Sequence, residues 1–596
     1  MKKTFTFIAS FLFVASLYAQ INPIKISKSL DIAEKEKVIR SGDEVLSHLM
    51  INPNPYTFSN TSSKASTEIE IGYTTYDLQT NNSVQNRLVV HEDGTMSAAW
   101  TISEELNSTW SDRGTGYNYF DGTSWSQNGA SSPGSQNPRL EDSRVGWPSL
   151  LKLGNGGECA ITHSTQNSYL NIASRSTIGS GTWSNINISE DYLIWNRSAV
   201  GGPDGNSIHL IALTEPSGGT FTGTPYEGLD GALLYYRSLD GGVSWDIQNM
   251  ILPGMDSTNF TGYGGDNYAI AAKGETIAFA YFNGWADSFI MKSTDNGDTW
   301  TKTIFIDFPV DLYDIDSGID QDADGTIDTM YSTTGSGAIL IDNNDMVHVT
   351  YGDMRILDAD LTDAGSSYFP GTNGLMYWNE NIGVDTSGGS MVSPSLWDHG
   401  NGLYIAQSED LDQSGTLDIL EGGNYGSGLS TMPNMGIDAN GVIWVSFSSA
   451  VENIVNVDGQ NFRHIYITKS TDGGLTWSAS VDVTPHDDWD GMQECVYGSM
   501  YPIVDDKIRI VYQKDFEPGN TLGADADIVD WNATVYLEID TLGLFSTNTS
   551  IIEENHIHPV NDNKIFDILG REWKSKFENL PKGVFIRNGK KMFKTK

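Results

Sequence analysis

Acidic side chains alternate with other residues in a short segment that contains a single glycine. DLDQSGTLDILE (residues 410–421) has oxygen-bearing residues at positions one, three, five, seven, nine and twelve of a calcium loop, and glycine at position six. Carboxylates crowded into a tight loop repel one another unless a cation lies between them. The expected calcium ligands are Asp410, Asp412, Ser414, Thr416, Asp418 and Glu421. The alternative is a solvated acidic loop that binds no metal.

A second segment, DQDADGTIDTMY (residues 320–331), matches the same loop through position nine. Tyr331 stands at position twelve, where a bidentate acid belongs. The expected ligands are Asp320, Asp322, Asp324, Thr326 and Asp328. Amphipathic helices flank neither segment, so we expect isolated calcium loops that make long insertions rigid.

A sequence repeat predicts the strands and turns between which these loops are inserted. SLDGGVSW (residues 238–245), STDNGDTW (293–300) and STDGGLTW (470–477) share one pattern, and weaker copies end at Trp125 and Trp183. Asp and Ser side chains bond to turn amides, and Gly permits a positive φ. We expect each Trp to pack between neighbouring sheets.

A hairpin pattern of two alternating strands around a polar turn precedes these boxes. It occurs seven times, starting at Asn86, Trp147, Gly201, Asn267, Gly337, Met432 and Met500. Two further strands follow in each unit, with the box at the turn between them. The units are therefore predicted to be four-stranded blades of an all-β propeller, about seven in number, with six as the alternative.

The boxes resemble the Asp-box, or BNR, repeats of sialidases and related β-propellers, over roughly residues 67–546. This resemblance is specific for the fold and weak for activity. The alternating segment TEIEIGYTTYDLQT (residues 67–80) has no hairpin partner of its own. We predict that it completes the last sheet and closes the ring, which removes open edges.

The same resemblance implies candidate site residues. Sialidases clamp a carboxylate with three arginines and use a Tyr–Glu pair as nucleophile and activator. Arg87, Tyr497 and Glu494 stand at positions that echo this machinery, although the proline of the family's Arg-Ile-Pro is missing after Arg87. Further arginines that could bind a ligand are Arg144, Arg197 and Arg355. The alternative is that these arginines pair with loop carboxylates.

Both ends of the chain carry expected targeting segments. Residues 1–19 have the basic, apolar and small-residue order of a secretory signal. Residues 20–66 are predicted to hold a helix over Ser27–Leu49 and a linker. Residues 547–596 resemble a small β sorting domain of the type IX secretion system, on FDILGRE (566–572), NLPKGVFI (579–586) and the closing NGKKMFKTK.

The composition of the chain disfavours some classes of binding partner. The net charge of −42 disfavours nucleic acid and anionic membranes. After the signal, no run is long enough for a transmembrane helix. Cys159 and Cys495 could form one bridge or remain two buried thiols. His163 and His348 are expected to be core or channel residues.

Taken together, these features predict a protein exported through the periplasm and released from, or held on, the surface of a Gram-negative bacterium. The type IX machinery would be one partner, and calcium a structural cofactor. The leading hypothesis is binding of an extracellular polysaccharide or glycoconjugate. The alternatives are an exo-acting glycoside hydrolase of sialidase type and a calcium-dependent adhesin.

Overall fold

The computed structural model describes most of the chain between residues 66 and 545. It covers residues 25–26, 32–35, 39–42, 66–126, 139–164, 169–188, 192–219, 221–363, 365–384, 403–421, 425–484, 493–523, 527–545, 565–567, 572–573, 579, 583–587 and 590–594. The predicted signal and most of the linker lie outside these residues. The chain divides into two compact units, Met1–Thr541 and Leu542–Lys596.

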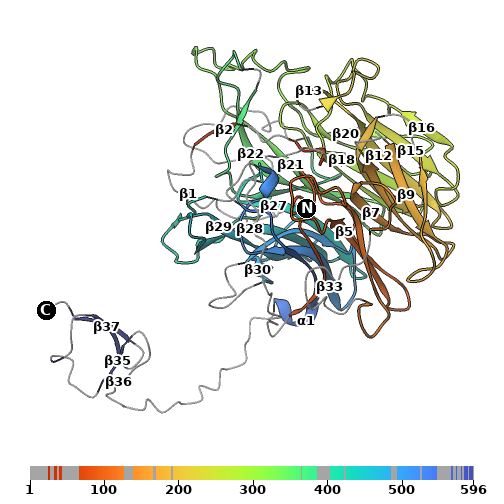
Figure 1. Ribbon diagram of the computed structural model, residues 1–596. Helices are drawn as coiled ribbons and strands as arrows, with labels where there is room; N and C mark the ends of the chain where they lie inside the picture. Colours follow the sequence, from red (N-terminus) through yellow and green to blue (C-terminus); the bar gives the residue numbers. More distant parts are fainter. Residues whose placement is uncertain are drawn as a thin grey trace, which may run out of the picture. The chain divides into compact units, whose positions relative to one another are not determined.

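The first unit is a seven-bladed β-propeller, as the hairpin count predicted (Figure 1). In chain order its sheets are β4 (Leu88–Val90), β5 (Met96–Ile102) and β6 (Gly114–Phe120); β7 (Gly146–Lys152), β8 (Glu158–Ser164), β9 (Tyr169–Arg175) and β10 (Ser184–Asn187); β11 (Leu193–Gly201), β12 (Ser207–Thr214), β15 (Leu233–Ser238) and β16 (Ile247–Met250); β17 (Tyr268–Lys273), β18 (Thr276–Tyr281), β19 (Ser288–Ser293) and β20 (Thr301–Ile306); β21 (Met330–Ile341), β22 (Val347–Leu357), β24 (Leu375–Asn379) and β25 (Leu403–Ala406); β27 (Ser430–Asp438), β28 (Ile443–Val455), β29 (Asn461–Ser470) and β30 (Val481–Asp482); and β31 (Glu494–Met500), β33 (Lys507–Asp515), β34 (Asn532–Asp540) and β3 (Ser66–Thr74). The inner strands β4, β7, β11, β17, β21, β27 and β31 lie against one another in succession around a central channel.

The last sheet is closed by the segment that comes first in the propeller. Strand β3 runs antiparallel to β34, with Ile69 opposite Tyr536 and Tyr73 opposite Ala533. The predicted closure is therefore confirmed. The closing strand forms the outermost strand of the last sheet and leads directly into the first blade, which joins the two ends of the ring.

The three full boxes adopt one turn, each between the third and fourth strands of a blade. In the second box the Asp295 carboxylate accepts hydrogen bonds from the amide and the hydroxyl of Thr299, at 2.9 and 2.6 Å, and from the hydroxyl of Ser293. Two of the box tryptophans pack edge-on against a tyrosine of the preceding blade: Trp300 against Tyr235 and Trp477 against Tyr377. Trp245 of the first box packs instead against Tyr236 of its own blade. Each box thus fixes its own turn, and the second and third boxes also join two sheets through their tryptophans.

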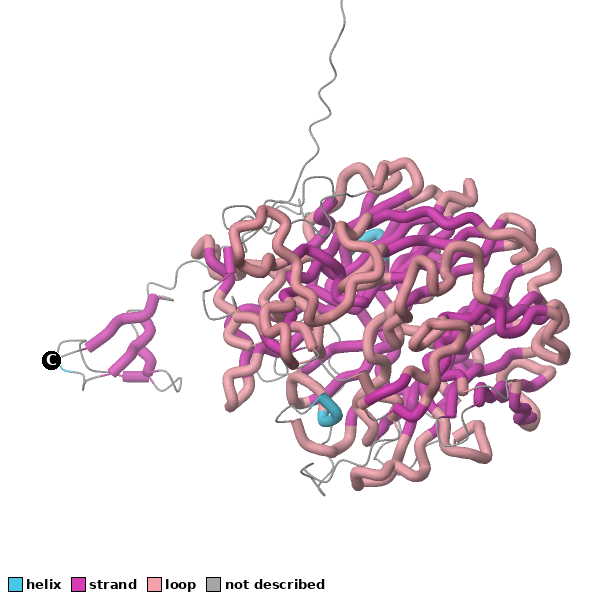
Figure 2. The backbone as a smooth tube through the Cα atoms, turned by 90° about the horizontal axis from the view of Figure 1, so that it is seen from above, coloured by secondary structure: helices cyan, strands magenta, loops and turns pink. Residues whose placement is uncertain are grey.

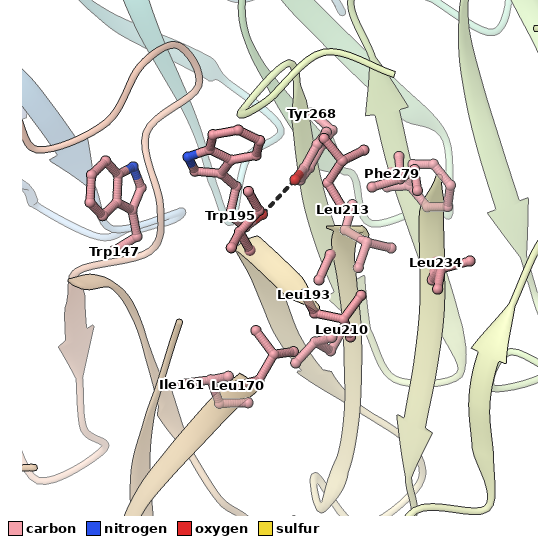
Figure 3. Packing of buried hydrophobic residues seen from close by; sticks show 14 of the residues in the cluster. Trp147, Ile161, Leu170, Leu193, Trp195, Leu210, Leu213, Leu234, Tyr268 and Phe279 are labelled. Atoms are coloured by element: carbon pink, nitrogen blue, oxygen red, sulfur yellow. Dashed lines mark hydrogen bonds between the residues drawn. The ribbon is translucent and has the colours of Figure 1, made fainter. Parts of the chain in front are cut away.

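The core of the early blades consists of leucine, isoleucine and aromatic side chains from adjacent inner strands (Figure 3). Trp147 and Trp195 project from neighbouring blades, and the hydroxyl of Tyr268 donates to the carbonyl oxygen of Trp195 at 2.5 Å. Both cysteines are buried, free thiols, so the alternative of a bridge is excluded. Burial raises the pKa of each thiol.

The segment before β3 differs from the expected helix. Within Ser27–Leu49, the described residues form the short strand β2 (Glu34–Lys35), which pairs with β23 (Ser367–Tyr368), and a non-helical stretch at 39–42. Further upstream, β1 (Lys25–Ile26) pairs with β26 (Thr416–Leu417). The interleaved Lys and Glu residues lack an apolar stripe, and pairing with the propeller outweighs their helix propensity.

The second unit contains one antiparallel sheet with the order β36 (Glu572–Trp573), β35 (Ile565–Asp567), β37 (Gly583–Arg587) and β38 (Lys590–Lys594). In both units strand and loop dominate, and helix in the described residues is limited to short turns such as α1 (Thr541–Leu544) (Figure 2). None of the described helices is long and apolar enough to cross a membrane.

Substituting the central carboxylate of a box tests whether the box stabilises the blade. We expect Asp295→Ala to lower the free energy of unfolding by about 1–2 kcal/mol, because several charge-assisted bonds are lost together. Urea unfolding measures the change, with Asp311→Ala at an exposed loop position as the control. Equal stability of the two variants would show that the turn does not depend on its carboxylate.

Candidate functional site

Six of the seven blades carry a left-handed residue where the inner strand begins, at the end of the channel that we call the mouth. These residues are Trp147, Trp195, Asp266, Gly335, Met432 and Tyr497, with φ between 52° and 79°. In five blades the register shifts at this point, and pairing resumes two residues later. Bulky residues adopt positive φ only where their surroundings enforce it, and such strain gathers at functional sites. The mouth is therefore the candidate site.

Asp266 connects several segments of the chain at the mouth. Its carboxylate is fully buried, pairs with the guanidinium of Arg197 at 2.9 Å and accepts from the indole nitrogen of Trp147 at 3.0 Å. The backbone and side-chain amides of Asn81 also donate to it, at 2.9 and 2.8 Å. Arg197, which was predicted to bind a ligand, is thus held by a carboxylate of the protein.

Arg87 and Tyr497 are both buried and close enough for the charge of each to affect the pKa of the other. Arg87 is buried and donates to the side-chain oxygens of Gln79 and Gln85, at 2.8 and 2.9 Å. Burial, followed by the nearby charge of Arg197, lowers the pKa of Arg87 to about 9. Tyr497 is 1% exposed, and its hydroxyl has no hydrogen-bond partner among the described residues.

Glu494 lies near Tyr497 but is hydrogen-bonded to a different tyrosine. Its carboxylate accepts from the hydroxyl of Tyr425 at 2.6 Å and from the backbone amide of Arg463 at 2.5 Å. Burial raises the pKa of Glu494 to about 7, against the opposing charge of Arg463. Sequence analysis did not identify Tyr425, which follows the first predicted calcium loop and contacts Glu494 only in the folded protein.

The remaining arginines occupy two different places. Arg144 donates to the carbonyl oxygens of Trp110 and Gly42, at 2.8 and 2.5 Å. Arg355 lies on β22, with its guanidinium over the ring of Phe369 at 4.4 Å. Arg113, which the sequence did not single out, also donates to the carbonyl of Gly42. The two arginines that converge on one oxygen are therefore Arg113 and Arg144.

The two histidines are buried, as expected. The Nδ1 of His163 accepts from the backbone amide of Trp195 at 3.1 Å, so its other ring nitrogen carries the proton toward the carbonyl of Ser41. Burial and the charge of Arg113 lower the pKa of His163 to about 3, which keeps the ring neutral. His348 contacts the hydroxyl of Tyr377 at 2.6 Å.

A pocket of about 520 Å³, which we call the rim pocket, opens beside the glycine of the ring. Gly335 lines this space together with Asn267 and Asn283, and the Asn267 amide packs against Gly335 so closely that an added Cβ would lie 2.6 Å from it. Its aromatic lining includes Phe260, Tyr263, Tyr281, Trp285, Tyr313 and Tyr368. The half-buried ring of Trp285 stacks on Tyr313, with 5.0 Å between ring centroids and 16° between planes. The rim pocket thus combines aromatic faces with amide side chains.

The central channel has a different character. It encloses about 630 Å³ between the inner strands, and its wall is mostly aliphatic, with Leu151, Val200, Ile270 and Ile339 among the lining residues. Polar side chains such as Lys152, Arg197 and Asn434 interrupt this wall, but aliphatic side chains outnumber them, whereas aromatic and polar groups dominate the lining of the rim pocket. The rim pocket is the better candidate for a hydrophilic ligand.

Both predicted calcium loops adopt the same backbone-to-carboxylate hydrogen bonds. In each, the first aspartate accepts from the amides of positions five and six: Asp410 from Ser414 and Gly415, and Asp320 from Asp324 and Gly325. Oxygens of the first three acidic residues of the second loop lie within 4.8 Å of one another.

The first loop gains a residue that the sequence did not predict. Glu452 from β28 places a carboxylate oxygen within 4.8 Å of those of Asp410 and Asp412, whereas Glu421 is exposed. Its carboxylate also accepts from the amides of Leu411 and Asp418, at 2.8 and 2.7 Å. Glu452 lies far beyond the loop in sequence, so no loop motif could have included it.

Three buried carboxylates of the seventh blade form a further cluster that the sequence did not reveal. Oxygens of Asp77, Asp515 and Asp527 lie within 4.8 Å of one another. Burial raises the pKa of all three, and for Asp515 and Asp527 the neighbouring carboxylates add to this effect. Asp77 is anchored by the backbone amide of Thr521 at 2.7 Å.

Comparison with solved structures finds several β-propeller proteins at low similarity. An ulvan lyase of polysaccharide lyase family 25, bound to a glucuronic acid–sulfated rhamnose unit, matches at 11% identity and TM-score 0.31, over 75% of this chain and 85% of that one. Penicillium chrysogenum α-L-arabinanase in complex with arabinobiose matches at 11% and 0.32, over 67% and 94%. Trypanosoma rangeli sialidase matches at 11% and 0.33, over 80% and 60%.

No protein-family model matches the chain. No curated protein matches it either. Similarities to solved structures at this level do not indicate what the chain binds or converts, so function has to be argued from the site itself.

The buried carboxyl group of Glu494 gives a pH test of the mouth. Because its folded pKa of about 7 lies above the ordinary value of 4.5, Glu494 favours folding below pH 4.5 and loses this contribution as the pH rises through 7. We expect Glu494→Gln to flatten the fall in unfolding free energy between pH 5 and 8 by up to about 3 kcal/mol.

Urea titrations at several pH values measure this slope. Glu92→Gln is the matched control, because the Glu92 side chain is 95% exposed. A wild-type slope retained in Glu494→Gln would show that Glu494 titrates like an ordinary surface carboxylate.

Proposed function

We propose that this protein is a glycan-binding β-propeller that holds a sugar chain in the rim pocket. The observation that carries the proposal is the lining of that pocket, where the stacked rings of Trp285 and Tyr313 lie beside the amides of Asn267 and Asn283. Sugar rings present apolar C–H faces, which pack on aromatic rings, and hydroxyl edges, which form hydrogen bonds with amides. A pocket of about 520 Å³ is in the size range of small-ligand sites.

Binding is favoured over hydrolysis by the state of the candidate catalytic residues. A hydrolase needs its acid and its nucleophile within hydrogen-bond reach of the substrate. Arg87, Glu494 and Tyr497 are each 2% exposed or less. The polar groups of Arg87 and Glu494 are, moreover, engaged with other parts of the protein. A sialidase-type activity is therefore the less supported alternative.

Removing the exposed ring of the pocket tests the proposal. We expect wild-type protein to be retarded in native gels that contain at least one of arabinan, xylan, laminarin or pectate, and Trp285→Ala to bind that glycan at least ten-fold more weakly. Loss of a stacking surface at the centre of a pocket accounts for a change of this size.

Tyr192→Ala is the control, because Tyr192 is 61% exposed and does not line the pocket. Retention on none of the four glycans, or equal retention of Trp285→Ala and wild type, would contradict glycan binding in the rim pocket.

Calcium is a structural cofactor in this proposal. The shared backbone frame of the two loops and the carboxylates gathered within 4.8 Å in each support it. Asp410, Asp412 and Glu452 would hold one ion, and Asp320, Asp322 and Asp324 the other. Oxygen-only donor sets of this kind suit Ca²⁺. The ions would neutralise the crowded loops and stiffen them.

We expect 2 mM Ca²⁺ to stabilise the protein against unfolding by about 1–2 kcal/mol relative to EDTA, because the ion binds the folded loops alone. The double variant Asp410→Asn/Asp412→Asn should lose part of this gain. Thermal unfolding followed by circular dichroism measures it, with exposed Asp458→Asn as the control. Identical curves in Ca²⁺ and EDTA would contradict calcium binding.

The protein acts outside the cell in this proposal. Residues 1–19 have the composition of a secretory signal, and the basic tail resembles a type IX sorting domain. The tail would then address the chain to the outer membrane of a Gram-negative bacterium, and the propeller would meet its glycan beyond that membrane.

A further inference from the structure

The stretch Ile39–Gly42, which we call the strap, lies across the mouth of the propeller. Its backbone amide at Arg40 donates to the side chain of Asn81 at 2.9 Å, and the guanidinium of Arg40 donates to the carbonyl of Leu522 at 3.0 Å. The strap therefore joins the first and last blades. It reaches the fourth blade too, where Ile39 lies close to Gly265.

Three successive carbonyl oxygens of the strap receive side-chain donors from the mouth. That of Arg40 accepts from the indole of Trp195 and the amide of Asn81, both at 3.0 Å. That of Ser41 faces the protonated nitrogen of His163, and that of Gly42 accepts from two arginines. The donors of the mouth are thus aimed at oxygen atoms, which is how a site for an oxygen-rich ligand is built.

The hydrogen bonds to the carbonyl oxygen of Gly42 are the strongest type among these contacts, because both donors are charged guanidinium groups. Arg113 is prepositioned by the carbonyl of Val145 at 3.0 Å and by the rings of Tyr76 and Trp147, 5.1 and 5.3 Å from its guanidinium carbon. Arg144 approaches the same oxygen from the other side. Two buried guanidinium groups bind a neutral carbonyl less strongly than they would bind a carboxylate or sulfate.

The strap is not needed to close the propeller. Strand β3 completes the seventh sheet and begins at Ser66, well after the strap. Upstream, the described residues are attached by the two-residue strands β1 and β2, by the packing of Ile26 and by the ion pair between Lys35 and Asp363. Ile39 also forms part of the wall of the rim pocket. Departure of the strap would therefore extend the rim pocket toward Arg113 and Arg144 without opening the ring.

We propose that the strap is an internal occupant of the mouth, which must leave before an acidic sugar of the bound glycan can contact Arg113 and Arg144. This inference rests on the proposed glycan binding and adds its regulation. The overall charge of −42 does not oppose it, because exposed charges beyond about 8 Å are screened at physiological salt, whereas the arginines act at contact. Cleavage or displacement of the segment before β3 would switch the site on.

Gly42 offers a way to expel the strap in the full-length chain. Its φ is +89°, and an added Cβ would lie 1.7 Å from Arg113 and 2.7 Å from Trp147. Gly42→Leu should therefore displace the strap. Gly94→Leu is the matched control, because Gly94 has φ +84° and open space around it. Both variants carry the same backbone penalty, and only the first collides with the mouth.

The probe is trigalacturonate, with maltotriose as the neutral comparison, measured by isothermal titration calorimetry. We expect Gly42→Leu to bind trigalacturonate at least ten-fold more tightly than wild type or Gly94→Leu, with no gain for maltotriose. Adding Arg144→Gln to Gly42→Leu should remove the gain. Trypsin should cut after Arg40 in Gly42→Leu and leave that bond intact in the control.

The outcomes separate the strap from the rim pocket. Cleavage at Arg40 without tighter binding would overturn the strap as an occupant of a ligand site, and no cleavage would show it to be a permanent part of the fold. If Gly42→Leu fails to fold, Arg40→Ala, which loses the bond to Leu522, replaces it with the same expected gain. Either failure leaves the gel test of Trp285→Ala unaffected, so the proposed function is judged separately.

Discussion

The buried carboxylate of Asp266 binds together four parts of the chain. Asp266 precedes β17, and its carboxylate joins the guanidinium of Arg197, the indole of Trp147 and the amides of Asn81, which belong to two other blades and to the turn after the closing strand. A buried charge is tolerated only when it is paired and fully hydrogen-bonded, so these groups have to stay in place together. The left-handed backbone at Asp266 directs the carboxylate into the mouth rather than along the channel wall.

The mouth is packed on one side, and a pocket lies on the other. Where the ring holds Trp147 and Trp195, indole rings fill the space and support the strap. At Gly335 the ring has no side chain, and the rim pocket forms there. One repeated backbone feature thus produces a packed half and a hollow half. The strap lies across the packed half, and Ile39 at its edge borders the hollow one.

The first predicted calcium loop is linked to the same N-terminal segment. Strand β26, within that loop, pairs with β1, and Ile26 packs into a small cluster with Leu417, Ile419 and Leu429. A cation that stiffens the loop would stiffen the platform on which this segment rests.

Short-range interactions account for the structural features that the sequence determined by itself. The Asp boxes, the hairpins, the closing strand and the calcium-loop frames depend on contacts within about a dozen residues or on period-two alternation, and both are visible in the chain. Only the tertiary structure brought Tyr425 to Glu494, Glu452 to Asp410, and Gly42 to Arg113. These pairs come from different blades or from outside the blades, and no periodicity relates their positions. The sheets determine which side chains meet, so the roles of the mouth residues were decided by how the ring closes.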